Sequence, residues 1–206
     1  QEMRCPVHLS IGQEAVAAGI CAALRPDDHV YASHRCHGPY LAKGGGIFPM
    51  MAELYGRVGG CARGKGGSMH LLDAKVGMMG SSSIVAGSIP LAVGSALSFV
   101  LRGTNQVAVV FFGDGAIEEG VFHESLNFAS FRKLPVLFVC ENNFYAVQSH
   151  ISVRQPGDNI HEHAQAHLMP GIRVDGMDVL AVYAAAREAV SLARRGEGPT
   201  LLECRT

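Results

Sequence analysis

With 206 residues, 48% of them hydrophobic and 17% charged, the chain can bury the core of one domain and is too apolar to be disordered. Its formal net charge of -1 at pH 7 gives no basic surface for nucleic acid, and no apolar stretch reaches the roughly 18 residues that span a membrane. The six cysteines form no Cys-x-x-Cys pair, which is typical of reduced thiols in a cytoplasmic protein.

The first part of the chain predicts helices separated by irregular segments. Helical periodicity covers Gln13 to Leu24, and a short helix is expected from Pro49 to Tyr55. Between them lies the passage His34–Pro39, which is rich in Gly, Pro and His. Residues 56–69 are rich in glycine and predict a loop.

The middle of the chain predicts a buried helix and then a strand–helix–strand unit. Residues from Ile84 to Leu101 are apolar nearly all round, with Pro90 in the first turn or at a kink. Val107–Phe112 and Val136–Cys140 are short, β-branched and aromatic, as in buried parallel strands, and Ile117–Phe131 between them is compatible with a helix.

The last part of the chain repeats this alternation. Gly157–His167 is polar and His-rich and predicts a mobile loop, followed by a short strand over Ile172–Val174. An apolar stripe from Val179 to Ala193 predicts a helix, and Thr200–Cys204 predicts a final strand. Strands that alternate with helices predict an α/β fold of three layers, a mostly parallel sheet with helices on both faces.

The two ends of the sequence suggest an excised domain. Gln1 is not an initiator methionine, no signal peptide is visible, and Thr206 follows directly on the last predicted strand. We therefore expect residues 1–206 to be a single domain that is truncated at both ends.

Two polar motifs follow the two central strands. Gly113-Asp114-Gly115 ends the first and Asn142-Asn143 ends the second. Because parallel strands present their carboxyl ends at one sheet edge, where ligands collect in α/β folds, the two motifs should lie close together. A carboxylate and an amide oxygen are hard ligands suited to Mg²⁺ or Ca²⁺, and Mg²⁺ takes its other oxygens from phosphates and water.

Each motif also has a purely structural interpretation. Asp114 would serve as the N-cap of the following helix, and its flanking glycines would serve the turn. Asn142 and Asn143 would be ordinary turn residues. Either explanation suffices for one motif, but the matching positions at two strand ends favour a shared site.

Other chemistries fit the sequence less well. Gly59-x-x-x-x-Gly64-Lys65 begins like a phosphate-binding loop, but position 66 is Gly instead of a hydroxyl residue and no strand precedes it. No Gly-x-Gly-x-x-Gly opens a helix after a strand, which argues against dinucleotide binding. His34, Cys36 and His37 are too closely spaced for a structural zinc site.

A cluster of nitrogen donors fits an anion better than a metal. Arg35, flanked by His34 and His37, supplies planar charge-assisted donors for diphosphate oxygens, although a solvated turn is the alternative. His8 precedes the first predicted helix and either supports it or belongs to a site.

Taken together, the motifs resemble a known family. Gly113-Asp114-Gly115 with Asn142-Asn143 is similar to the magnesium and diphosphate motif of thiamine diphosphate enzymes. The chain resembles the α subunit of the first component of 2-oxo acid dehydrogenase complexes, of the pyruvate and acetoin type, from about residue 5 to Thr206. The supporting segments are His8-Leu-Ser-Ile-Gly-Gln-Glu-Ala15, His34-Arg-Cys-His-Gly38, Gly64-Lys-Gly-Gly-Ser-Met-His70, Glu141-Asn-Asn-Phe-Tyr145 and Arg173-Val-Asp-Gly-Met-Asp178.

The resemblance implies a thiamine diphosphate-binding fold and a role for each matching residue. Mg²⁺ would be bound by Asp114, Asn143 and the carbonyl of Tyr145. The diphosphate would meet the backbone N–H groups of Gly115 and Ala116 at a helix start.

The remaining roles concern the rest of the cofactor and the substrate. Arg35 and His34 would contact the diphosphate, and His34 replaces the tyrosine of pyruvate-specific members, as in acetoin-type relatives. Ser83 and Val85 would contact the aminopyrimidine, although Gly80-Ser-Ser-Ser83 replaces the glycine-rich segment that is usual in the family. His8 would be the catalytic histidine near the substrate.

The same resemblance implies the activity and its partners. A 2-oxo acid such as pyruvate would be decarboxylated oxidatively, with acyl transfer to a lipoyl group on an acyltransferase. A β subunit would supply the glutamate that activates the cofactor, in a heterotetramer of two α and two β chains. The alternatives are cleavage of acetoin, two-carbon transfer to a sugar, and a non-catalytic cofactor-holding module.

Overall fold

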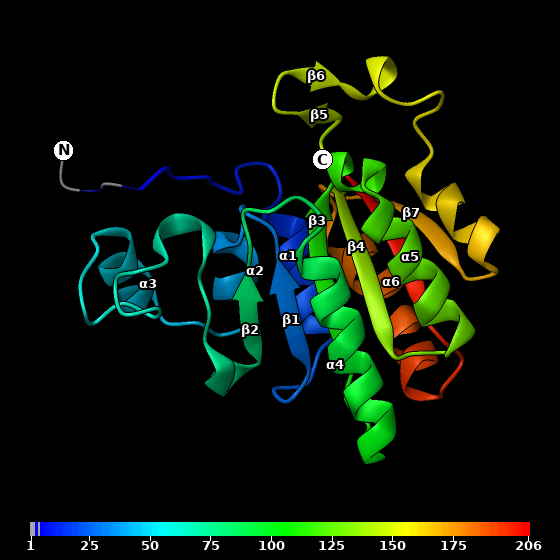
Figure 1. The fold of residues 1–206 in the computed structure, drawn as a ribbon, viewed down its shortest axis with the longest axis horizontal. Coiled ribbons are helices and arrows are strands. Elements are labelled where there is room, and N and C mark those ends of the chain that lie inside the picture. The colour runs from blue at the N-terminus through cyan, green and yellow to red at the C-terminus, as the bar shows by residue number, and fades with distance from the viewer. Residues whose placement is uncertain (1–2, 4) are drawn as a thin grey trace.

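The computed structural model describes residue 3 and residues 5–206, so Gln1 lies outside the described residues. Its centre is a six-stranded sheet in the order β2-β1-β3-β4-β8-β7, and every neighbouring pair is parallel (Figure 1). The strands are β1 (His29–Ala32), β2 (Met78–Ser81), β3 (Ala108–Gly113), β4 (Val136–Asn142), β7 (Gly171–Asp175) and β8 (Thr200–Arg205).

Helices cover both faces of this sheet. α4 (Ser88–Arg102) and α5 (Gly120–Phe131) pack on one face, and α1 (Glu14–Ala22) and α6 (Val179–Arg194) lie together on the other. Alternate residues of β3 enter two separate apolar cores, Val109 on the α1 and α6 side and Val110 on the α4 and α5 side. The predicted three-layer, mostly parallel α/β fold is therefore confirmed.

Smaller elements surround the sheet. α2 (His37–Ala42) packs against α1, and α3 (Ile47–Leu54) lies beyond the β2 edge of the sheet. The 3₁₀ segments η1 (Gly67–Met69) and η2 (Ala74–Val76) precede β2 in the chain. At the carboxyl edge stand η3 (Asp114–Glu118), the two-residue strands β5 (Tyr145–Ala146) and β6 (Ser149–His150), and η4 (Ile151–Val153). η5 (Ile160–His167) runs beside β7 and β8.

Several predicted elements need correction. β1, β2 and α2 were not predicted, because they are only four to six residues long and carry His, Ser and Gly. Residues 157–167 are not simply a loop: most of them form η5, which buries Ile160 and Ala164 in the core. The helix expected from Ile117 begins at Gly120, after the 3₁₀ turn η3.

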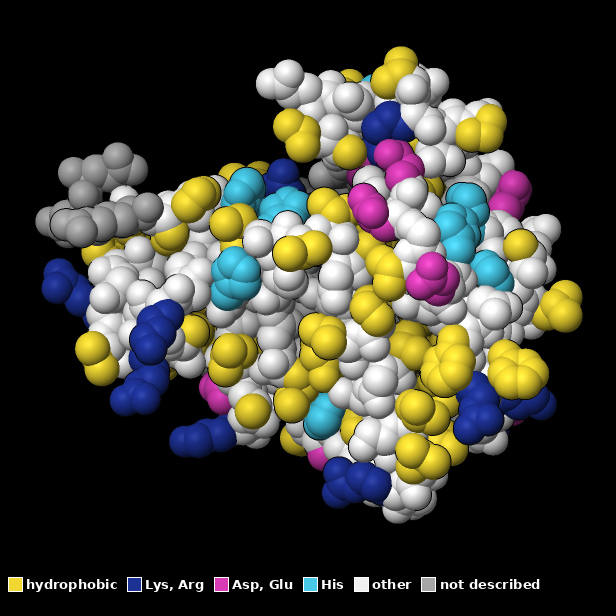
Figure 2. Space-filling view, viewed as in Figure 1, with side chains coloured by type: hydrophobic (Ala, Val, Ile, Leu, Met, Phe, Trp, Pro, Cys, Tyr) yellow, Lys and Arg dark blue, Asp and Glu magenta, His cyan; other side chains and the backbone are white. Residues whose placement is uncertain are grey.

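The predicted buried helix is exposed along one side. α4 begins at Ser88 rather than Ile84, and its side chains Leu91 and Leu101 are 57% and 72% exposed. Phe131 of α5 is 80% exposed on the same face, where Figure 2 shows apolar side chains over both helices.

The strand order places a topological switch point between β1 and β3. From β1 the chain moves outward to β2, then returns past β1 to β3 and continues in the other direction to β4. The loops that leave the carboxyl ends of β1 and β3 therefore diverge, which opens a crevice of the kind where α/β proteins bind ligands. No helix among the described residues is long and apolar enough to cross a membrane.

Candidate active site

A cavity of about 400 Å³ lies at this switch point. Its walls come from the loops after β1, β3 and β4, from residues 84–86, and from His8 and Gln13 before α1. Nine of the ten predicted site residues line it: His8, His34, Arg35, Val85, Asp114, Gly115, Ala116, Asn143 and Tyr145. Ser83 does not line the cavity. Its hydroxyl is exposed and lies 3.5 Å from Nε2 of His70.

The Asp114 carboxylate is buried at the start of η3. Its Oδ2 accepts a hydrogen bond from the Arg154 guanidinium, whereas no donor to Oδ1 is present within residues 5–206. The residue before it, Gly113, occupies the N-cap position, with no side-chain cap. The capping interpretation of Asp114 is therefore wrong, and one carboxylate oxygen remains available for a ligand.

Arg154 is a site residue that the sequence did not reveal. It reaches back from the segment after β6 to bind Asp114 and Glu118 of η3, and its Nε donates to the carbonyl of Ser149 at 3.1 Å. Nothing in the local sequence marks it, because its partners are 36 and 40 positions away.

The two asparagines do form a turn, as their structural interpretation predicted. Oδ1 of Asn142 accepts the backbone N–H of Phe144 at 3.0 Å, and Oδ1 of Asn143 accepts that of Tyr145 at 3.1 Å. Only Asn143 lines the cavity, where it faces the same space as Asp114 and Tyr145. The turn and the site are thus compatible roles of one segment.

Strained backbone surrounds the cavity. Ala86, Phe144 and Val147 have φ values of 61°, 68° and 57°, a region that non-glycine residues rarely adopt. Ala86 and Val147 line the cavity, and Phe144 is in the turn between two lining residues. Such conformations persist where the surrounding structure enforces them, and they concentrate at functional sites.

The basic side of the cavity is built by the loop after β1. Nη1 of Arg35 donates to the carbonyl of Leu9 at 2.7 Å, which leaves its remaining donors for another acceptor. The rings of His8 and His34 meet edge to face with centroids 4.9 Å apart. Burial, the neighbouring His8 and Arg35 together lower the pKa of His34, so this ring is neutral at neutral pH.

Glu141 is a second residue that the sequence did not single out as a site. It lies at the end of β4, lines the cavity, and has no hydrogen-bond partner for Oε1 among the described residues. Burial raises the pKa of Glu141 to about 8 against the opposing effect of Arg35, so the carboxyl carries a proton at neutral pH.

A family model described as "Dehydrogenase E1 component" matches residues 1–206. The chain belongs to this family. The family resemblance inferred from the sequence motifs is therefore confirmed.

Named relatives agree with this membership. The alpha subunit of acetoin:2,6-dichlorophenolindophenol oxidoreductase from Bacillus subtilis (strain 168) is 50% identical over 200 residues, covering 97% of this chain and 60% of that protein. The alpha-3 subunit of the chloroplastic pyruvate dehydrogenase E1 component from Arabidopsis thaliana is 45% identical over 207 residues, covering 97% of this chain and 48% of that protein. The chain thus spans about half of these relatives.

A solved structure agrees with the fold. An X-ray structure from Mycobacterium smegmatis, of an enzyme described as thiamin diphosphate-dependent, aligns with a TM-score of 0.61 at 19% identity. The alignment covers 94% of this chain and 31% of the other. At this identity the similarity shows a shared fold.

The glycine-rich loop binds a carboxylate from the same chain, that of Glu53. The Glu53 carboxylate, 1% exposed, accepts the backbone N–H groups of Ala62, Gly64, Gly66 and Gly67 at 2.6–3.1 Å. The sequence that begins like a phosphate-binding loop therefore wraps an internal carboxylate, which fills the place of a phosphate.

The zinc alternative also fails on geometry. Sγ of Cys36 donates to the Ser68 carbonyl, and Nε2 of His37 lies 2.8 Å from the Ser68 hydroxyl, whereas His34 lines the cavity. No group of three or more metal-binding side chains occurs in the described part of the chain. All six cysteines are free thiols.

Proposed function

We propose that this chain is the cofactor-binding part of the α subunit of a thiamine diphosphate-dependent 2-oxo acid dehydrogenase of the pyruvate type. The observation that carries the proposal is the shared cavity at the switch point, into which Asp114, Asn143 and Arg35 project from three different loops. This combination offers oxygen ligands for a cation beside donors for an anion.

The residues present fit Mg²⁺ and a diphosphate. Asp114 has one oxygen without a donor in the described chain, and the Asn143 side chain and the Tyr145 carbonyl add two neutral oxygens, a set that Mg²⁺ accepts when phosphates and water complete it. A Cβ on Gly115 would lie 2.9 Å from Cβ of Ala146, so η3 and the β5 segment are in close contact there.

Each residue has a separate task in this proposal. Asp114, Asn143 and Tyr145 hold Mg²⁺, while Gly115 and Ala116 bind the diphosphate through the backbone. Arg35 and the neutral His34 supply further donors to the diphosphate.

The outer part of the cavity faces the reacting groups. Val85 and Ser83 are proposed to border the aminopyrimidine, with Val85 in the cavity wall. His8 is proposed to hold and transfer a proton near the substrate carbonyl. When bound, thiamine diphosphate supplies an electron sink for the charge that remains after a bond next to a carbonyl breaks.

The partners and the location are part of the proposal. The printed names of the relatives call them alpha subunits, which supports a β chain, and we propose a heterotetramer of two α and two β chains that transfers its acyl group to a lipoyl-bearing acyltransferase. The six free thiols support a cytoplasmic location.

Acetoin is the second candidate substrate. The Bacillus relative named for acetoin is 50% identical, and His34 stands in the wall of the cavity where pyruvate-specific members carry tyrosine. Pyruvate and acetoin should therefore be compared as substrates of the same preparation.

The experiment measures turnover of the complete protein with its β chain, by reduction of an artificial electron acceptor. Activity should require both Mg²⁺ and thiamine diphosphate, and Asp114→Asn should lower it at least about 100-fold, because a charged metal ligand is lost. The control Asp27→Asn changes an exposed carboxylate at the opposite end of β1 and should leave turnover unchanged. Full activity of Asp114→Asn, or turnover without a divalent cation, would contradict the proposal.

A further inference from the structure

Asn142 is held from outside the cavity, although its neighbour Asn143 faces into it. The Asn142 side chain is completely buried and does not line the cavity. Its Nδ2 donates to Oε1 of Glu203 at 3.0 Å, its Oδ1 accepts from Phe144, and its backbone carbonyl accepts the N–H of Thr206 at 3.0 Å. Both ends of the amide are therefore fixed.

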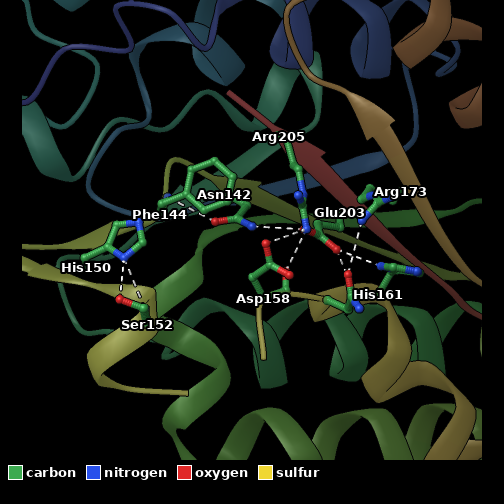
Figure 3. A network of polar contacts seen from close by, with 10 residues as sticks. Asn142, Phe144, His150, Ser152, Asp158, His161, Arg173, Glu203 and Arg205 are labelled. Atoms are coloured by element: carbon green, nitrogen blue, oxygen red, sulfur yellow. Dashed lines mark hydrogen bonds and ion pairs between the residues drawn. The ribbon is translucent and has the colours of Figure 1, made fainter. Parts of the chain in front are cut away.

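Glu203 is the centre of this network (Figure 3). It lies on β8 beside β4, is 0% exposed, and accepts four hydrogen bonds. Besides Asn142, the donors are Nε of Arg205 at 2.9 Å, the backbone N–H of His161 at 3.1 Å and its ring Nδ1 at 2.8 Å. Burial alone would raise the pKa of Glu203, but these donors outweigh it and hold the pKa below its usual value.

A buried carboxylate destabilises the fold unless its oxygens accept hydrogen bonds. A fully hydrogen-bonded one holds its partners in a fixed geometry. The geometry fixed here is that of the turn from Asn142 to Tyr145. Asn142 accepts the N–H of Phe144, which has φ 68°, and the residues on either side of Phe144, Asn143 and Tyr145, line the cavity.

We infer that Glu203 is a positioning residue for the cation site: it acts through Asn142 to set the turn that carries Asn143 and Tyr145. This rests on the proposed function only where it concerns the cation, because the effect on the turn itself does not require a ligand. Outer partners of metal ligands typically change metal affinity by about 10- to 100-fold when they are replaced.

The test compares Glu203→Gln with the control Glu197→Gln in the complete protein. Glu197 pairs with Arg195 at an exposed site, so its change should have no effect. Mn²⁺ is used as a paramagnetic substitute for Mg²⁺, with thiamine diphosphate present and at a temperature where each variant is folded by circular dichroism. Glu203→Gln should weaken Mn²⁺ binding about tenfold or more. Unchanged Mn²⁺ affinity with only a lower unfolding temperature would overturn the inference.

A second readout needs no ligand. In the cation-free protein, amide hydrogen exchange over residues 143–146 should become at least about tenfold faster in Glu203→Gln, because the Asn142 amide is held less firmly and protects the Phe144 N–H less. If wild-type protein binds no Mn²⁺, the proposed function fails, and this exchange still decides the role of Glu203. Unchanged exchange would reject it.

A second variant covers the case in which Glu203→Gln does not fold. Asn142→Asp retains the acceptor for Phe144 but places a carboxylate oxygen against Glu203 instead of an N–H donor. It should also accelerate exchange over residues 143–146. Combining it with Glu203→Gln exchanges donor and acceptor and should recover part of the protection, whereas additive losses would contradict a direct pairing.

Discussion

The two oxygens of Asp114 have different surroundings, and this difference makes its role testable. Oδ2 is paired with Arg154, whose side chain is 10% exposed, while Oδ1 has no donor in the described part of the chain. Arg154 therefore neutralises a buried carboxylate and ties the segment after β6 to η3.

Replacing Arg154 by Met should destabilise the protein by about 3 kcal/mol, because a buried carboxylate loses its counter-ion. The measurement is urea unfolding of the complete protein. Mg²⁺ with thiamine diphosphate should restore part of the loss, since a bound cation would neutralise Asp114 in another way. The control Arg195→Met removes a surface pair whose side chains are 54% and 51% exposed, and it should cause no measurable change. A loss that Mg²⁺ does not relieve would contradict this account.

At the residue scale, the sequence predicted the site residues that follow adjacent strands and missed those that reach their partners from distant parts of the chain. Asp114 and Asn143 follow two consecutive strands, so their proximity follows from the fold class. Arg154 and Glu203 reach their partners across 40 and 61 positions. Glu141 belongs to a segment that supports the family resemblance, but its place in the site depends on burial that a sequence does not show.

At the scale of elements, the contact between α1 and α6 depends on a glycine. A Cβ on Gly19 of α1 would lie 2.8 Å from Cγ1 of Val182 and 3.0 Å from the backbone nitrogen of Tyr183 in α6. Gly94 of α4 has a different environment, because a Cβ there would meet no heavy atom within 4 Å.

Gly19→Ala should therefore lower the free energy of unfolding by about 1–3 kcal/mol, as overpacking does. Gly94→Ala should raise it by about 0.4–1 kcal/mol, because Ala restricts the unfolded chain and clashes with nothing. Denaturant unfolding of both variants checks the pair of signs. Equal effects of the two changes on the free energy of unfolding would show that the contact between α1 and α6 does not exclude a side chain at Gly19.

The elements that the sequence predicted correctly have a strong local signal, which is helical periodicity in α1 and α6 and a continuous apolar run in β3 and β4. β3, β4, α1 and α6 were found within a few residues of their observed bounds. β1 and β2 were missed because four residues show too little alternation, and they form by pairing with strands that are distant in sequence. The exposed side of α4 was missed because composition alone does not distinguish a buried helix from one with an uncovered apolar face.

At the scale of the whole molecule, buried titratable groups set the response to acid. Burial is the main cause of the lowered pKa values of five histidines: His29, His34, His37, His163 and His167. Glu53 and Glu203 also have lowered pKa values, because their hydrogen-bond donors outweigh burial. In every case the folded protein resists a proton that the unfolded chain accepts.

The unfolding temperature should therefore fall in two stages on acidification. The histidine contribution is complete above the unfolded pKa of 6.5 and is lost below it, and the carboxylate contribution is lost below 4.5. Thermal unfolding between pH 8 and about pH 2 measures both stages. His163→Gln should reduce the first, because burial and then the neighbouring His123, with ring centroids 5.5 Å apart, lower the pKa of His163. Because burial raises the pKa of Glu141 to about 8, its carboxyl opposes the first stage in the same range. A dependence on pH between 8 and 5.5 that His163→Gln leaves unchanged would contradict the histidine contribution.

The carboxylate of Glu53 also has a consequence for how readily the protein accepts its ligands. The loop around it is already folded about a charge that the chain supplies, so the order of this loop does not depend on a ligand. Binding of a ligand at the switch-point cavity therefore carries no entropic cost for ordering this loop.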